Sequence, residues 1–207
     1  MRVLLLILVV VCVIVGFFGS ALAQDETAGE PVVVLSTTQG DIKIRFFPDV
    51  APAHVESFLA HAESGYFTGT TFHRVIPGFV IQGGDPNSKD DDPTNDGYGG
   101  HSSAGPGTYL PAEFNSIPHE RGILSMARSQ HPDSAGSQFF ICVADVPSLD
   151  NQYTVFGQVV AGMDVADRIV NAPRDSRDRP LENQTVLNVT IEYWTPEQID
   201  EALAVLQ

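Results

Sequence analysis

An arginine embedded in an apolar stretch is the most unusual chemical feature of this chain. Arg74 lies within Phe72-His73-Arg74-Val75-Ile76, and after Pro77-Gly78 a second apolar run, Phe79-Val80-Ile81, ends in Gln82. A guanidinium is planar, permanently charged and carries five N–H donors, so it can stabilise charge without exchanging a proton. Arg74 is therefore either a fixed donor in a functional groove or a surface arginine whose stem packs on apolar neighbours.

The usual sequence signatures of nucleophilic, nucleotide and metal chemistry are missing from the chain. It has no Gly-x-Ser-x-Gly elbow, no phosphate-binding loop, no dinucleotide fingerprint and no His-Glu-x-x-His motif. Asp92, Thr94, Asp96 and Gly97 imitate the first half of a calcium-binding loop, but Ser103 stands where such a loop needs a bidentate glutamate. The six histidines lack ligand spacing; they are His54, His61, His73, His101, His119 and His131. We therefore expect neither a metal nor another cofactor.

Size and charge limit the classes of protein further. With 207 residues, 43% of them hydrophobic, the chain can bury one sizeable core and has little room for a second domain. It has 26 acidic residues against 11 Lys and Arg, which gives a net charge of −15. The negative electrostatic field of such a chain repels nucleic acid and anionic lipid, so neither is an expected partner.

The N-terminal segment has the order of a secretory signal peptide. Arg2 precedes an apolar run at 3–15, and Ala21-Leu22-Ala23 forms a small-x-small cleavage site. An uncleaved anchor is the alternative, although the run is at the short end of the roughly 20 residues that span a bilayer. We expect a signal peptide at 1–23, an acidic linker at 24–31 and an exported protein, periplasmic or extracellular, without membrane contact after cleavage. Loss of the signal peptide would leave Cys142 as the only cysteine and exclude an intrachain disulfide.

Short β-rich segments separated by turn residues follow the linker. Gln39-Gly40 separates the first two segments and Pro77-Gly78 the next two, as in hairpins. A Gly-, Pro- and Asp-rich segment at 83–111 is expected to be a long structured loop. The expected strands are 32–38, 41–47, 71–75, 79–82, 122–127, 138–144, 154–160 and 185–193. The expected helices are 52–64, which starts with a proline and ends before Gly65, and 163–170.

Many short strands and only two helices predict a mainly β fold, since a parallel sheet would need more crossover helices. We expect a closed antiparallel eight-stranded β-barrel at 32–193, capped by two α-helices. The C-terminal tail at 194–207 is expected to be a separate short helix. Its start, Thr195-Pro196-Glu197-Gln198, suits an N-cap and first turn, and Ile199, Leu203 and Leu206 share one apolar face.

Several motifs in a fixed order connect the chain to a known family. Besides the stretch at 72–85, they are Gly122-Ile123-Leu124-Ser125-Met126-Ala127, Gly136-Ser137-Gln138-Phe139-Phe140-Ile141-Cys142, Tyr153-Thr154-Val155-Phe156-Gly157 and Gly162-Met163-Asp164-Val165. Together these motifs resemble the cyclophilin family of peptidyl-prolyl cis/trans isomerases over about residues 31–193. Several long motifs in register are far more specific than one short pattern.

The resemblance implies an enzyme that accelerates rotation about X-Pro bonds. The amide barrier of about 18–20 kcal/mol comes from conjugation of the nitrogen lone pair with the carbonyl. As the bond twists, the lone pair localises on the prolyl nitrogen, where Arg74 would donate a hydrogen bond. A donor that fits the twisted state better than either planar isomer lowers the barrier without proton transfer.

The resemblance also implies which residues surround the groove. Arg74, Gln82 and Phe79 would form the catalytic set, with Gln82 holding Arg74 or the substrate backbone. The main chain at Arg128 would pair with the peptide. The substrate-binding residues would be Phe79, Val80, Gln82, Ala127, Arg128, Ser129, Gln138, Phe140, Leu149 and Tyr153, of which Phe79, Val80, Phe140 and Leu149 would line the proline pocket.

Some of these residues have a structural alternative. An isolated phenylalanine is more often part of a core than of a groove. Adjacent side chains on a strand face opposite sides, however, so at least one of Phe139 and Phe140 must leave the interior. His73 is expected to be a hydrogen-bonding structural residue and not a catalyst.

The groove departs from many eukaryotic members of the family. Ser148 stands where they carry a tryptophan, Tyr153 where they carry a histidine, and Val80 where a methionine is common. These choices, like Arg128-Ser129 in place of Asn-Ala, resemble bacterial members and favour a bacterial source. In the eukaryotic members the tryptophan offers cyclosporin contact area and a hydrogen bond. Because this chain lacks it, we expect cyclosporin binding to be possible but weak.

Two other functions remain open from the sequence. One is a non-catalytic module that binds proline peptides, which need not keep Arg74. The other is a holdase that uses the acidic surface and the tail helix. For an isomerase, the expected partners are proline-containing peptides and unfolded or partly folded exported proteins, whose folding X-Pro isomerisation can limit.

Overall fold

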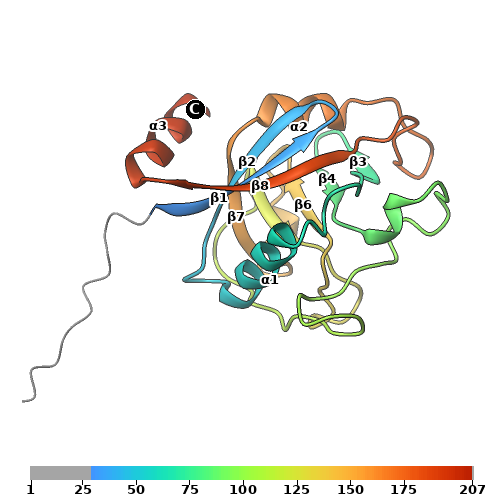
Figure 1. Cartoon of the computed structure of the whole chain (residues 1–207), viewed down its shortest axis with the longest axis horizontal. Helices are drawn as coiled ribbons and strands as arrows, with labels where there is room; N and C mark the ends of the chain where they lie inside the picture. The colour runs from blue at the N-terminus through green and yellow to red at the C-terminus, as the bar shows by residue number, and fades with distance from the viewer. Residues whose placement is uncertain (1–28, 207) are drawn as a thin grey trace, which may run out of the picture.

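The computed structural model describes residues 29–206, so the predicted signal peptide at 1–23 and most of the predicted linker lie outside the described residues. One curled sheet of eight strands forms the body, with α1 and α2 at its two ends and α3 beside it (Figure 1). The strands are β1 Glu30–Thr37, β2 Gly40–Phe46, β3 Arg74–Ile76, β4 Val80–Gly83, β5 Ile123–Met126, β6 Phe139–Cys142, β7 Val155–Ala161 and β8 Val186–Trp194. The helices are α1 Pro52–Glu63, α2 Met163–Val170 and α3 Pro196–Leu206, with 3₁₀ turns η1 at Pro86–Lys89 and η2 at Pro147–Leu149.

The sheet is antiparallel at every paired strand and runs in the order β3-β4-β6-β5-β7-β2-β1-β8. The mainly β, eight-stranded prediction is confirmed, whereas the closed barrel is not. Strands β3 and β8 are the two edges and share no ladder among the described residues. The segment before β3 joins the start of β8 through a bridge between Thr71 and Thr185 and through backbone hydrogen bonds. These bonds run from Gly69 N to Val186 O (2.8 Å), from Val186 N to Thr70 O (2.8 Å) and from Phe72 N to Gln184 O (2.9 Å). The predicted strand at 71–75 shortens to a three-residue β3, which is too short to pair along the nine residues of β8.

The hairpin turns form where the sequence places glycine. Gly40 at the β1–β2 turn and Gly78 at the β3–β4 turn have φ angles of 126° and 74°, which side chains other than glycine rarely adopt. Strand β1 begins at Glu30, inside the predicted linker, because Glu30 pairs with Trp194 at the end of β8. The β3–β4 turn places Arg74, the first residue of β3, opposite Gln82 in β4.

The core fills the inside of the curled sheet and is rich in aromatic rings. Phe58 from α1 packs against Phe67 and Phe139, with ring centres 4.7 and 5.3 Å away. Helix α2 covers the other end of the sheet with Ala166 and Ile169, both fully buried. This rigid interior supports the strands whose outer side carries the groove.

Helix α3 is a docked appendage, as the tail sequence predicts. A capping box starts it, since Gln198 Oε1 accepts from Thr195 N (2.9 Å) and Thr195 Oγ1 from Gln198 N (3.4 Å). Ile199 is 1% exposed and packs with Val32 and Val160, while Leu206 at the helix end stays largely exposed. Among residues 29–206, no helix combines the length and apolar character that crossing a membrane requires.

Candidate active site

A cavity of about 490 Å³ opens on the outer side of β3, β4 and β6. Nine of the predicted site residues line it: Arg74, Phe79, Val80, Gln82, Ala127, Arg128, Phe140, Leu149 and Tyr153. The other two, Ser129 and Gln138, line an adjoining cavity of about 370 Å³ that shares Gln82, Ala127 and Arg128 with the first. The structure therefore brings all the predicted site residues to one continuous groove.

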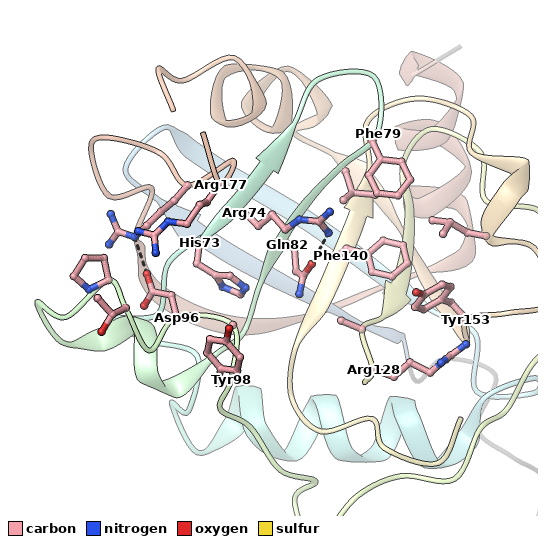
Figure 2. A pocket seen from close by; sticks show the side chains of 17 residues that line it. His73, Arg74, Phe79, Gln82, Asp96, Tyr98, Arg128, Phe140, Tyr153 and Arg177 are labelled. Atoms are coloured by element: carbon pink, nitrogen blue, oxygen red, sulfur yellow. Dashed lines mark hydrogen bonds and ion pairs between the residues drawn. The ribbon is translucent and has the colours of Figure 1, made fainter. Parts of the chain in front are cut away.

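An apolar socket forms one end of this groove. Phe140 is 5% exposed and belongs to the cluster under the groove, whereas its neighbour Phe139 is 1% exposed and belongs to the core inside the sheet. The prediction that the two rings face opposite sides is thus confirmed. The Tyr153 ring stands edge-on to Phe140 at 5.6 Å, and Phe79 lies across the opening from them (Figure 2). The socket has the size and character to hold a small apolar ring.

A buried histidine supports the floor of the socket, a role that no motif in the sequence indicates. The His119 ring stacks on Phe140 with centres 6.0 Å apart, and its Nδ1 and Nε2 lie 3.0 Å from Asp150 Oδ1 and Ser125 Oγ. Burial lowers the pKa of His119, and the hydrogen bond to Asp150 opposes this effect without reversing it. His119 is therefore a neutral ring held at both nitrogens, which fixes the position of Phe140.

Arg74 lies at the rim of the socket and is held by a line of amide side chains. Arg74 Nη1 donates to Gln82 Oε1 at 3.3 Å, and Gln82 Nε2 donates to Gln138 Oε1 at 3.0 Å (Figure 2). Gln138 Nε2 in turn donates to the carbonyl oxygens of Gly97 (2.9 Å) and Gly99 (2.8 Å). A backbone carbonyl can only accept a hydrogen bond, so Gln138 must turn its NH₂ group toward the two glycines and its oxygen toward Gln82. Gln82 must then turn its own oxygen toward Arg74. The bond to Gln82 uses one of the five N–H groups of Arg74 and leaves the guanidinium exposed at the cavity.

Asp85 fixes the loop that carries those two carbonyls. Its buried carboxylate accepts from the backbone N–H groups of Asn87 (2.8 Å), Gly97 and Gly99 (3.2 Å). A side chain at Gly99 would overlap Asp85, which explains the glycine there. The long loop predicted at 83–111 is thus ordered around one carboxylate, directly after the β4 strand.

Arg128 closes the far side of the groove. Its Nε and Nη2 donate to the carbonyl of Gln152 at 3.0 and 2.9 Å, and its guanidinium carbon lies 4.8 Å from the Tyr153 ring centre. Within the described part of the chain, the backbone N–H and C=O of Arg128 make no hydrogen bond. They are therefore available to an extended peptide.

The opposite end of the cavity is lined by residues outside the predicted site: His73, Pro93, Thr94, Asp96, Gly97, Tyr98, Arg177 and Arg179. His73 was expected to be a hydrogen-bonding structural residue, but neither ring nitrogen has a partner among the described residues, although the side chain is only 6% exposed. Burial lowers its pKa, despite the nearby carboxylates of Asp85 and Asp96. The run Arg174-Asp175-Ser176-Arg177-Asp178-Arg179, in a chain with few basic residues, was the sequence signal for this end.

The acidic loop that imitates a calcium site has other contacts. Asp96 forms an ion pair with Arg179, with Oδ2 and Nε 2.7 Å apart. Asp92 accepts from both the backbone N–H and the hydroxyl of Thr94, and these hydrogen bonds lower its pKa. These two carboxylates therefore order the loop.

The sequence profile described as "Cyclophilin type peptidyl-prolyl cis-trans isomerase/CLD" matches residues 32–191, from β1 into β8. The chain belongs to this family. A cyclophilin-type peptidyl-prolyl cis-trans isomerase of Cryptosporidium parvum, crystallised in the presence of the dipeptide Ala-Pro, shares the fold with a TM-score of 0.70. The two are 36% identical, over 78% of this chain and 98% of that one.

Curated relatives fall into two groups by length. A "probable peptidyl-prolyl cis-trans isomerase" of Brucella abortus is 40% identical over 178 residues, which cover 83% of this chain and 89% of that protein. A peptidyl-prolyl cis-trans isomerase of Arabidopsis thaliana is 44% identical over 161 residues, or 77% of this chain. This cyclophilin chain spans about a quarter of the plant relative, since the match covers 24% of that protein.

The arrangement defines what chemistry the cyclophilin groove can perform. It combines an apolar socket, a fixed guanidinium at its rim and free backbone groups on its far side. Burial keeps His73, which lines the groove, and His119, which lies beneath Phe140, in the neutral form at pH 7. The groove is therefore built to bind a peptide and to stabilise a change in its shape.

Proposed function

We propose that this cyclophilin catalyses cis/trans isomerisation of X-Pro bonds in exported proteins, with Arg74 as the catalytic donor. The observation that carries the proposal is the Arg74 guanidinium, held by Gln82 at the rim of an apolar socket that fits a proline ring. Membership of the cyclophilin family supports the same activity. The Cryptosporidium relative was crystallised in the presence of the dipeptide Ala-Pro, which supports proline-containing peptides as the ligand class.

The binding step uses the socket and the free backbone of Arg128. Phe79, Val80, Phe140 and Leu149 hold the proline ring, and the Tyr153 ring closes the socket from the side. The peptide pairs its backbone with Arg128 at a residue outside the X-Pro bond, while Ser129 and Gln138 line the path of the peptide beyond it. The ring is thereby fixed, and the carbonyl that precedes it is free to rotate.

The catalytic step is the twist of the X-Pro bond. In either planar isomer the prolyl nitrogen shares its lone pair with the carbonyl, and a donor at that nitrogen gains little. In the twisted state the lone pair is localised, and Arg74 donates to it from a position that Gln82 and Gln138 hold in advance. A preorganised charged donor of this kind accelerates a reaction by about 100- to 1,000-fold.

Isomerase activity is tested with the full chain and an Ala-Pro tetrapeptide, by measuring cis/trans exchange in the NMR spectrum at about 1% enzyme. We expect exchange to become much faster than the uncatalysed reaction, with multiple turnovers per enzyme. Peptide binding without faster exchange would instead support the non-catalytic binding module.

The exported location is a separate part of the proposal and rests on the sequence at 1–23. The order of charge, apolar run and Ala21-Leu22-Ala23 supports cleavage before Gln24 and release into the periplasm or the extracellular medium. Sequencing the N-terminus of the protein isolated from its own host tests this. A start at Gln24 is expected, and an intact N-terminus in a membrane fraction would favour an anchor.

Weak cyclosporin binding follows from the outer wall of the socket. Ser148 in η2 is exposed and small, so the inhibitor loses an aromatic surface there. We expect the unmodified protein to need far more cyclosporin for inhibition than Ser148→Trp does, with similar isomerase rates for both. Nanomolar inhibition of the unmodified protein would contradict this.

A further inference from the structure

The charge of the groove is opposite to that of the chain. The chain has 26 acidic residues against 11 Lys and Arg, yet four arginines and one carboxylate line the main cavity. The arginines are Arg74, Arg128, Arg177 and Arg179, and the carboxylate is Asp96. More than a third of the basic side chains of an acidic protein therefore gather at one cavity, so its local charge is positive.

Two of the four arginines are already engaged by the protein. Arg128 donates to three backbone carbonyls, those of Ser129, Gln130 and Gln152. Arg179 is 20% exposed, forms the ion pair with Asp96 and donates to Asn183 Oδ1 at 3.1 Å. Neither guanidinium has a free pair of N–H groups that could bind a ligand carboxylate in a bidentate way.

The Arg177 guanidinium, in contrast, is only loosely bound by the protein. Its side chain is 63% exposed, and its one ion pair joins Nε to Asp175 Oδ2 at 3.5 Å. Asp175 is two residues away in the same turn, where its other oxygen accepts the backbone N–H groups of Arg177 (2.8 Å) and Arg179 (3.0 Å). Such a loose surface pair contributes little, so an incoming carboxylate can take the Nη groups of Arg177 in a bidentate fork.

The position of Arg177 relative to the socket determines which part of a bound peptide it can contact. Figure 2 shows Arg177 and Asp96 on the side of Arg74 that faces away from Phe79 and Phe140. A residue near the proline, whose ring occupies the socket, can therefore extend its side chain past Arg74 to Arg177. The buried His73 ring forms part of the wall along this path.

We propose that the groove selects proline segments that carry an aspartate or glutamate close to the proline, with the carboxylate held by Arg177. This proposal rests on the proposed isomerase function and names the substrate class of the same site. Arg177 is a specificity residue, because it contacts a neighbouring side chain and not the rotating bond. Its loss should remove the preference for acidic peptides.

The test compares proline tetrapeptides that carry Glu, Gln or Lys either directly before the proline or directly after it. kcat/KM and Kd are measured for the full chain, for Arg177→Gln and for Arg174→Gln. Arg174 is the matched control, since it lies on the same loop, has its own partner in Asp178 at 3.4 Å and does not line the cavity. Arg177→Lys, which keeps the charge but not the fork, is the fourth protein.

At one position or more, we expect Glu to exceed Gln in kcat/KM by about fivefold, the scale of a favourable exposed charge pair. Arg177→Gln should remove this preference, Arg177→Lys should keep part of it and Arg174→Gln should keep all of it. The proposal is overturned if no position prefers Glu, or if Arg177→Gln keeps the preference. Because Kd is measured as well, a protein that prefers Glu peptides but turns over none would uphold the selectivity and overturn the isomerase function.

Discussion

Arg74 and Gln82 face each other across the shortest pair of strands in the sheet, and the sequence contains enough information to predict this. The turn is centred on Gly78, which puts Arg74 and Gln82 at equal distances from it along the chain, and their side chains form the 3.3 Å hydrogen bond. The opposite orientations of Phe139 and Phe140 follow from strand alternation alone. Arg177 could not be found in this way, because it lies 95 positions along the chain from Gln82 and only the tertiary fold brings the two residues to one cavity.

The free thiol offers a prediction at the scale of one residue. Cys142 is fully buried beneath the groove, and burial raises its pKa to about 12. A thiol that is both protonated and enclosed does not react as a thiolate. We expect iodoacetamide at pH 8 to leave Cys142 unmodified in the folded protein and to modify it quickly in urea, as measured by mass spectrometry of the peptide that contains it. Rapid modification of the folded protein would show that the strand opens at the groove.

At the scale of elements, local patterns predict the strands and helices well but not how the sheet ends. Helix α2 has the predicted bounds, and the other elements differ by a few residues, because periodicity and turn residues are local signals. Whether β3 pairs with β8 depends on long-range geometry that no local pattern contains. Closure of the predicted barrel is therefore not confirmed at this one seam.

The loop that follows β4 acts on Arg74 through amide side chains, which gives a prediction at the element scale. Gln138→Ala removes the link from the Gly97 and Gly99 carbonyls to Gln82, so Gln82 and Arg74 lose their fixed orientation. We expect kcat/KM to fall about tenfold, equivalent to about 1.4 kcal/mol. Most of the loss should be in kcat, because the socket is unchanged. Gln130→Ala, an exposed glutamine outside this line, is the control, and an equal loss in both variants would contradict a positioning role.

At the scale of the whole molecule, buried histidines link stability to pH. Burial lowers the pKa of His54, His61, His73 and His119 below the ordinary value of 6.5. As the pH falls, these histidines are therefore protonated in the unfolded chain at a higher pH than in the folded protein. Their contribution to the free energy of unfolding is fully present above pH 6.5 and is lost as the pH falls through the lower pKa values of the folded state. The hydrogen bonds of His54 to Glu113 and of His119 to Asp150 weaken this effect without reversing it.

We expect the free energy of unfolding to fall by at least about 1 kcal/mol from pH 7.5 to pH 5, the value of one pKa unit at a single group. Urea unfolding at the two pH values measures it. His54→Gln should make the pH dependence smaller, whereas substitution of the exposed His131 by glutamine should leave it unchanged. Equal or higher stability at pH 5 would contradict the account of these histidines.

The central claim is that Arg74 stabilises the twisted bond and contributes little to holding the peptide. The most direct measurement compares kcat/KM and peptide Kd for the unmodified protein, Arg74→Ala, Arg74→Lys and Phe140→Ala. Arg74→Ala should lower kcat/KM by about 100- to 1,000-fold, the scale of one preorganised charged donor. Its peptide Kd should change by less than about threefold, since an exposed donor contributes little to binding the planar ground state. Arg74→Lys should recover only part of the rate, because a point charge lacks the fork.

Phe140→Ala removes a wall of the socket that both isomers and the twisted state share, so it should weaken peptide binding together with turnover. The account therefore predicts a rate loss without a binding loss for Arg74→Ala, and both losses for Phe140→Ala. If Arg74→Ala binds and turns over its peptides like the unmodified protein, Arg74 is not the catalytic donor and the groove acts through its shape alone.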